Sequence, residues 1–268
     1  MNLSITTDYA RDTGDAEPYL QRIAEVGFSH VHWCHQWNTD FIYSTWEIEW
    51  IESCLKNHGL RLLDLHASLG VEKCWSASRE SARSAGVELV KNRVDMTARL
   101  GAQVIVMHTG TPDEKGEEVF WSQIRKSLDE LEPYCRERDI RIALENGHWR
   151  YIHQLLHEYP PDYLGLCYDS GHGNIMRDNG PAELDRLKDR LIALHLHDND
   201  RTSDQHNLPF TGTVPWTRLA EIIAHSVYRN PVNLEVSMRN AGIPDEPAFL
   251  ARAYTCASRL SDMIGRFK

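Results

Sequence analysis

The chain has 268 residues, of which 41% are hydrophobic and 25% charged, and its formal net charge is -10. This composition fits one large globular domain, and the negative charge argues against nucleic acid as a partner, because nucleic-acid binding depends on clustered Lys and Arg. No apolar run approaches the roughly 20 residues that span a bilayer, no signal-like segment opens the chain and no CxxC pair occurs, so we expect a cytoplasmic protein with free thiols and no membrane partner.

Short apolar segments alternate with segments of helical character along the whole chain. The predicted strands are 3–6, 30–34, 60–66, 104–108, 140–145, 164–169, 191–197 and 232–236, and the predicted helices are 18–26, 45–58, 79–100, 117–138, 151–158, 182–190, 216–225 and 247–264. Gly27, Gly59 and Gly101 follow three of these helices, at the position where glycine commonly ends a helix. Eight strand–helix repeats in a chain of this length predict an α/β protein, a single (β/α)8 barrel over residues 1–268.

The segment 191–200, LIALHLHDND, reads as a buried strand that ends in polar residues. Alternation places His195 and His197 on one face of this strand, whereas Leu194 and Leu196 lie on the other. Burying two imidazoles costs free energy unless something binds them. A bound metal ion is the simplest explanation of this pattern.

Metal-ligand residue types also occur at the ends of other predicted strands, which converge on one site in a barrel of this kind. These strand-end residues are His66, His108, Glu145, Asp169, His195 and Glu235. The loops that follow add His172, Asp204 and His206. Imidazole and carboxylate ligands suit divalent Mn, Zn, Co, Fe or Mg and do not choose among them.

Strand parity predicts which side chains point into the barrel. The expected inner residues are Asp64, Val106, Ala143, Cys167, Ala193 and Asn233, and the expected outer residues are Leu65, Met107, Leu144, Tyr168, Leu194 and Leu234. Small or polar side chains inside and bulky ones outside are what a barrel with a hydrated mouth requires.

Each candidate also has a simpler interpretation. A single strand-end histidine is commonly a hydrogen-bonded structural residue, and Asp204 and His206 fit a solvated surface loop equally well. Buried glutamates on central strands are harder to explain without a bound partner. His197 is expected to line the substrate site or, with Asp198, to orient the ligands. The histidines of the second strand, at positions 30, 32 and 35, are interpreted as structural or pocket-lining.

These motifs resemble the xylose isomerase-like TIM barrels, a superfamily that includes sugar isomerases and epimerases and the endonuclease IV enzymes. The resemblance covers essentially the whole chain and is strongest in LENG, LGLCYDSGH, IALHLHDND, DQHNLPFTGTVPW and NLEVS. In the ketose epimerase branch, it implies that Glu145, Asp169, His195 and Glu235 hold one divalent ion. The same branch implies that His172 and Arg201 contact substrate oxygens. In the endonuclease IV branch, all nine candidate ligands together hold a three-zinc cluster.

The resemblance favours a divalent-metal isomerase or epimerase that acts on a small carbohydrate-like carbonyl compound. Glu145 and Glu235 would serve as acid and base around an enediolate that the metal stabilises. One alternative is a zinc phosphodiesterase of the endonuclease IV type, which cleaves at abasic sites, and another is a keto-sugar dehydratase or lyase on the same site. The sequence leaves open whether the chain forms a homo-oligomer.

Overall fold

The computed structural model describes residues 2–176 and 179–268 and contains one sheet of parallel strands. The strands are β1 (Leu3–Thr6), β2 (His30–Trp33), β3 (Arg61–His66), β4 (Val104–Met107), β5 (Arg141–Glu145), β6 (Leu164–Asp169), β7 (Leu191–His195) and β8 (Val232–Leu234). Their order in the sheet is β7-β6-β5-β4-β3-β2-β1-β8, so every strand from β1 to β7 lies beside its neighbour in the sequence. The predicted (β/α)8 barrel is confirmed.

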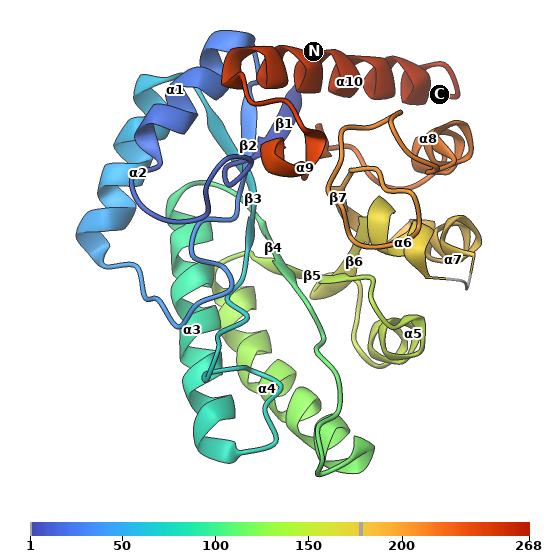
Figure 1. Ribbon diagram of the computed structural model, residues 1–268. Coiled ribbons are helices and arrows are strands. Elements are labelled where there is room, and N and C mark those ends of the chain that lie inside the picture. Colours follow the sequence, from blue (N-terminus) through green and yellow to red (C-terminus); the bar gives the residue numbers. More distant parts are fainter. Residues whose placement is uncertain (1, 177–178) are drawn as a thin grey trace.

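Helices cover the outside of the barrel (Figure 1). They are α1 (Glu17–Val26), α2 (Thr45–Asn57), α3 (Glu80–Arg99), α4 (Glu117–Glu137), α5 (Trp149–Glu158), α6 (Ser170–Ile175), α7 (Gly180–Leu187) with the 3-10 turn η1 (Lys188–Arg190), α8 (Trp216–Ala224), α9 (Met238–Ala241) and α10 (Glu246–Gly265). The last helix, α10, contacts α1, α8, β1 and β8, so it covers the seam between the first and last strands. In the part of the chain that the structure describes, every helix is too short or too polar to cross a bilayer.

The helix ends follow the local sequence. Gly27, Gly59 and Gly101 have φ values of 110°, 69° and 79°, a left-handed region that glycine adopts without a steric penalty. The start of α2 is a capping box, in which Ser44 accepts from the backbone N–H of Glu47 and the Glu47 carboxylate accepts from the backbone N–H of Ser44. Such local signals explain why the boundaries of the first three helices lie close to the predicted ones.

The side chains of the strands alternate as expected. The small cluster inside the barrel contains Val106, Ala143, Cys167 and Ala193. The large cluster between strands and helices contains Leu65, Met107, Leu144, Tyr168, Leu194 and Leu234. Bulky residues therefore anchor the helices, while the small inner ones leave the mouth of the barrel to polar groups.

Two details of pairing shape that mouth. A register shift in β2, between Val31 and His32, places His32 opposite Asp64 of β3. At the seam, β7 and β8 end earlier than predicted, but the backbone N–H of Leu196 donates to the Asn233 carbonyl at 3.2 Å and the N–H of Glu235 donates to the Leu196 carbonyl at 3.2 Å. These two bonds close the barrel and bring Glu235 beside the end of β7.

The sequence did not predict α6, whose six residues include two glycines. The Asp169 side chain accepts from the backbone N–H of His172 at 2.6 Å and caps its first turn. Gly171 and Gly173 pack closely against the side chains of His197 and Tyr168, where a Cβ atom would collide. Tertiary packing therefore stabilises a helix that glycine-rich sequence disfavours, and it holds His172 over the mouth of the barrel.

Candidate metal centre

Four strand ends bring four ligand-type side chains to one point. Glu145, Asp169 and His195 are the last residues of β5, β6 and β7, and Glu235 follows β8 directly. Each offers a ligand atom that lies within 4.8 Å of the other three, and all four side chains are buried. The convergence of these residues, expected from the sequence, is what the structure contains.

The atoms at the centre of this group have no hydrogen-bond partner within the described residues, 2–176 and 179–268. His195 Nδ1 lies 2.8 Å from Glu235 Oε2 and 3.2 Å from Glu145 Oε2, yet neither approach has hydrogen-bond geometry. In the part of the chain that the structure describes, both nitrogens of His195 and both of these oxygens are buried without a partner. Orphaned polar atoms of this kind are costly. The nitrogen and oxygen donors aimed at one point therefore fit a divalent cation.

The two glutamates of this group favour the ionised form, as the carboxylate ligands of a cation must. Burial alone would raise the pKa of both glutamates, but the histidines around them outweigh it and hold the pKa of Glu145 and Glu235 well below the ordinary value. Burial opposes protonation of His195, but the neighbouring Cys167, Glu235 and Glu145 raise its pKa well above the ordinary value. The carboxylates around this point therefore favour a positive charge there, which a bound divalent ion would supply.

A second group shares Glu145. His66 Nε2 and His108 Nε2 each lie 3.6 Å from Glu145 Oε2. His66 Nδ1 donates to the backbone carbonyl of Ala67 at 3.0 Å, which fixes the tautomer and leaves the Nε2 lone pair facing the carboxylate. The Trp37 ring packs against His66 with the ring centroids 4.3 Å apart. The lone pair of His66 and the nearby ring nitrogen of His108 approach one carboxylate oxygen, so a cation could lie between them.

A third group lies at the outer edge of the mouth. His172 Nε2 and His206 Nε2 approach Asp204 Oδ2 at 3.3 and 3.0 Å. Their Nδ1 atoms donate to the backbone carbonyls of Asn146 at 3.0 Å and Glu235 at 3.1 Å, so both rings face Asp204 with Nε2. Although burial opposes it, Asp204 and Glu235 raise the pKa of His206 to about 10. A histidine that donates one N–H to a carbonyl and directs the other nitrogen at an anion has the arrangement of a metal ligand.

All nine predicted ligands therefore gather at the mouth, in three groups. His197, which the sequence predicted to line the substrate site or to orient the ligands, is fully buried. Its Nε2 donates to Asp169 Oδ2 at 2.9 Å. Its ring stacks on His206 with the centroids 4.0 Å apart and the planes 6° from parallel. This placement suits an orienting role, and its contact with substrate stays a prediction.

Arg201 lines a cavity to which none of the nine candidate ligands contributes. Its Nε donates to Asn174 Oδ1 at 3.1 Å, and the side chain lines a cavity of about 510 Å³ beside α6 and α7. The cavity that contains Glu235 and His206 is a different one, of about 530 Å³, and none of the described residues lines both cavities. The predicted contact of Arg201 with substrate oxygens stays a prediction.

Sequence reasoning missed several residues around the cavity at Glu235. Asp8, Arg11 and Arg239 line it together with Trp37. Asp8 lies two residues beyond the end of β1, and Arg239 lies in the segment after β8, so the rule that strand ends converge could have identified both. The cavity carries acidic, basic and aromatic groups, a lining that suits a small polar ligand.

The comparisons with known proteins agree with this architecture. Residues 20–253 match the family described as xylose isomerase-like TIM barrel, and the chain belongs to that family. It is similar to "Uncharacterized protein y4fM" of Sinorhizobium fredii, with 32% identity over 275 residues that cover 91% of this chain and 88% of that protein. It is also similar to "Probable endonuclease 4" of Staphylococcus carnosus, with 24% identity over 206 residues that cover 68% of this chain and 69% of that protein.

Solved structures share the fold across the full length. The crystal structure of D-psicose 3-epimerase in the presence of D-fructose matches with a TM-score of 0.81 at 16% identity, over 99% of this chain and 100% of that chain. At this identity the likeness shows the barrel fold alone. The function has to be argued from the site.

Proposed function

We propose that the protein is a divalent-metal-dependent isomerase or epimerase of a sugar or sugar derivative. The observation that carries the proposal is the convergence of Glu145, Asp169, His195 and Glu235 on one buried point with orphaned donor atoms. A divalent ion bound there, Mn, Zn, Co or Mg, would act as a Lewis acid on a substrate carbonyl and the adjacent hydroxyl. Solved structures of sugar epimerases that share the fold, such as D-psicose 3-epimerase and L-ribulose 3-epimerase, support this choice of substrate class.

The two glutamates are suited to moving a proton. They come from β5 and β8, strands separated in the barrel by β6 and β7, so they reach the centre from different sides. The depressed pKa of both side chains favours the carboxylate form, in which a glutamate accepts a proton from carbon. One glutamate, as the carboxylate, would remove the proton beside the carbonyl. The other would have to enter the step as the carboxylic acid, and it would give its proton to the opposite face or to the neighbouring carbon.

The cavity next to Glu235 suits a small polyhydroxylated compound. Its volume of about 530 Å³ lies within the usual range for small-molecule sites. Trp37 lines it and can stack on the C–H face of a sugar, while Arg11 and Asn38 offer donors to hydroxyl oxygens. The expected contacts of His172, Arg201 and His197 with substrate belong to this same proposal.

The test is solvent deuterium exchange into a panel of ketoses and keto-sugars with the metal-loaded protein. Wild type should exchange a proton beside the carbonyl only when metal is present, and Glu235→Gln should slow exchange by about 100-fold or more, because glutamine cannot accept the proton. Glu158→Gln, on the exposed surface of α5, is the matched control and should behave as wild type. Absence of metal-dependent exchange with every compound, or full activity of Glu235→Gln, would refute the proposal.

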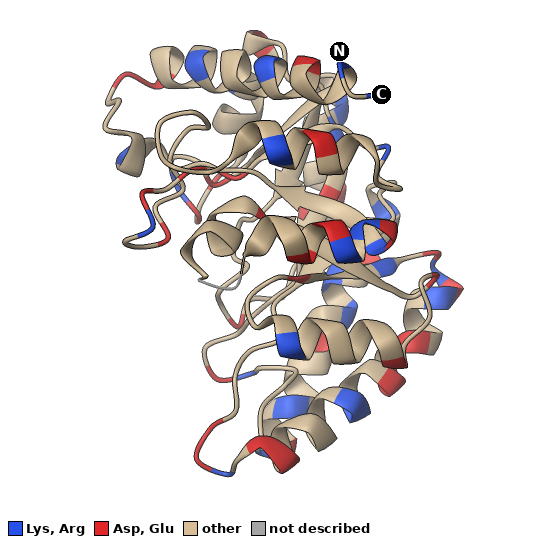
Figure 2. Ribbon diagram, turned by 90° about the vertical axis from the view of Figure 1, so that its right-hand side faces the viewer, with Lys and Arg blue, Asp and Glu red and all other residues tan. Residues whose placement is uncertain are grey.

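A second candidate function is a multi-zinc phosphodiesterase that cleaves at abasic sites in DNA. The groups His66–His108 and His172–Asp204–His206 favour it, because a single-ion isomerase does not require them. The surface charge of the protein argues against DNA as a substrate. In the view of Figure 2, Lys and Arg alternate with Asp and Glu along the helices instead of forming one basic face.

Metal content and DNA cleavage separate the two candidates. About three zinc ions per chain with cleavage of an abasic duplex would establish the phosphodiesterase. Ketose exchange without cleavage would establish the isomerase. Dehydratase or lyase chemistry on the same site would appear as loss of substrate without an isomeric product.

A further inference from the structure

A buried histidine outside the nine predicted ligands is oriented as a metal ligand. The His32 side chain on β2 is fully buried, and its Nδ1 donates to Asp64 Oδ1 at 2.6 Å. Nε2 therefore carries the lone pair, and this buried atom has no hydrogen-bond partner among the residues that the structure describes. A carboxylate that fixes one nitrogen of a histidine while the other faces an open point is a common arrangement behind metal ions in proteins.

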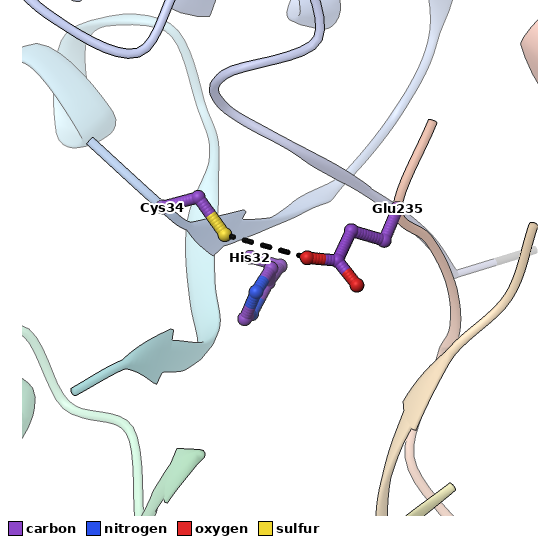
Figure 3. Close-up of side chains that lie close together, drawn as sticks. All are labelled: His32, Cys34 and Glu235. Carbon is purple, nitrogen blue, oxygen red and sulfur yellow. Dashed lines mark hydrogen bonds between the residues drawn. The ribbon is translucent and has the colours of Figure 1, made fainter. Parts of the chain in front are cut away.

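Cys34 and Glu235 lie close enough to His32 for the three side chains to bind one ion together. In Figure 3 the His32 imidazole lies beside the gap between Cys34 and Glu235, and a dashed line joins thiol and carboxylate. Each of the three residues offers a ligand atom within 4.8 Å of the other two, and all three side chains are buried. Cys34 Sγ lies 3.9 Å from Glu235 Oε1, and two such ligands on one zinc ion stand about 3.6 Å apart.

The two oxygens of Glu235 face two different groups. Oε2 approaches His195 Nδ1 at 2.8 Å, within the site described above, whereas Oε1 accepts from the Cys34 thiol. A carboxylate in this position can bridge two ions, as carboxylates do in sites with two metals about 3.5–4 Å apart. Glu235 is thus the shared residue of two neighbouring ligand sets.

We propose that His32, Cys34 and Glu235 form a further metal site, selective for zinc or another thiolate-binding divalent ion. Asp64 fixes the tautomer of His32, and Glu235 bridges this ion to the one held by Glu145, Asp169 and His195. Thiolate and imidazole prefer Zn²⁺ or Co²⁺ to Mg²⁺ or Mn²⁺, so the two sites differ in selectivity. On binding, the metal takes the position of the thiol proton, which is released to solvent.

Three protein ligands leave a fourth position of a tetrahedral ion open. Of the three ligands, Glu235 also lines the cavity that contains Asp8 and Trp37, from which water or a ligand oxygen would reach the open position. The site does not depend on which reaction the protein performs, and its test reads metal coordination rather than turnover.

Cobalt titration of the metal-free, full-length protein tests the proposal directly. Wild type should develop the near-ultraviolet thiolate-to-cobalt charge-transfer band, and Cys34→Ser should lose that band and bind one ion fewer per chain. Cys167→Ser is the matched control, because Cys167 also lies within reach of Glu145 and His195; it should keep the band. Asp64→Asn should weaken cobalt binding at this site by about 10–100-fold.

A second measurement needs no variant, so it tests the proposal even if Cys34→Ser does not fold. X-ray absorption at the zinc edge of the zinc-loaded wild type should show a sulfur scatterer at about 2.3 Å. No sulfur scatterer in wild type would overturn the proposal, and so would a charge-transfer band that persists in Cys34→Ser and disappears in Cys167→Ser.

Discussion

His197 donates a buried hydrogen bond to the Asp169 carboxylate, and replacing it gives the sharpest test of the site geometry. Its Nε2 donates to Asp169 Oδ2 at 2.9 Å in a fully buried environment. His197→Leu keeps a side chain of similar size but removes this donor. Loss of such an orienting bond weakens metal binding by about 10–100-fold, which corresponds to about 1.4–2.7 kcal/mol. The buried carboxylate keeps the backbone N–H of His172 as a donor to Oδ1, but loss of the charge-assisted bond to Oδ2 also costs about 1.5–3 kcal/mol of folding stability.

The assay is chelator competition for Mn²⁺ at neutral pH, with thermal unfolding measured on the same samples. His197→Gln can place an amide N–H near the position of Nε2 and should recover most of the affinity. His153→Leu is the matched control, because His153 Nε2 lies 2.6 Å from Glu183 in a pair on α5 and α7; it should leave metal affinity unchanged. A folded His197→Leu protein that binds Mn²⁺ within about threefold of wild type would refute the reasoning.

Two further predictions concern stability. In Gly171→Ala the added Cβ would lie 1.9 Å from His197 Cε1, and we expect a loss of about 1–3 kcal/mol in urea unfolding; an unchanged midpoint would contradict this packing. Burial lowers the pKa of His35 to about 4, although Asp12 and Asp15 oppose the shift. The unfolded chain then binds the proton more readily, so this contribution to stability is complete above about pH 6.5 and about 3 kcal/mol is lost as the pH falls to about 4. His35→Asn should remove that part of the slope between pH 7 and pH 4, and a slope equal to that of wild type would contradict the assignment.

The sequence by itself determined the fold and predicted which candidate ligands lie together at the mouth of the barrel. Eight alternating elements predict the barrel, because parallel strands need a helical crossover after each strand. Since the carboxyl ends of parallel strands meet at one face, residues as far apart in the chain as His66, Glu145 and Glu235 could be assigned to one site without coordinates. Periodicity and strand ends are local properties, and that is why the sequence alone was sufficient for them.

Only the tertiary structure decided which ligand groups each of these residues belongs to and which neighbouring side chains orient it. A register shift that no local signal marks places His32 opposite Asp64. Because of this pairing, a histidine interpreted from the sequence as structural or pocket-lining became a candidate ligand. Closure of the seam between β7 and β8 set one oxygen of Glu235 toward His195 and the other toward Cys34. Such contacts depend on pairing register and side-chain rotamers across the barrel, and these are settled by packing between elements that are distant in the chain.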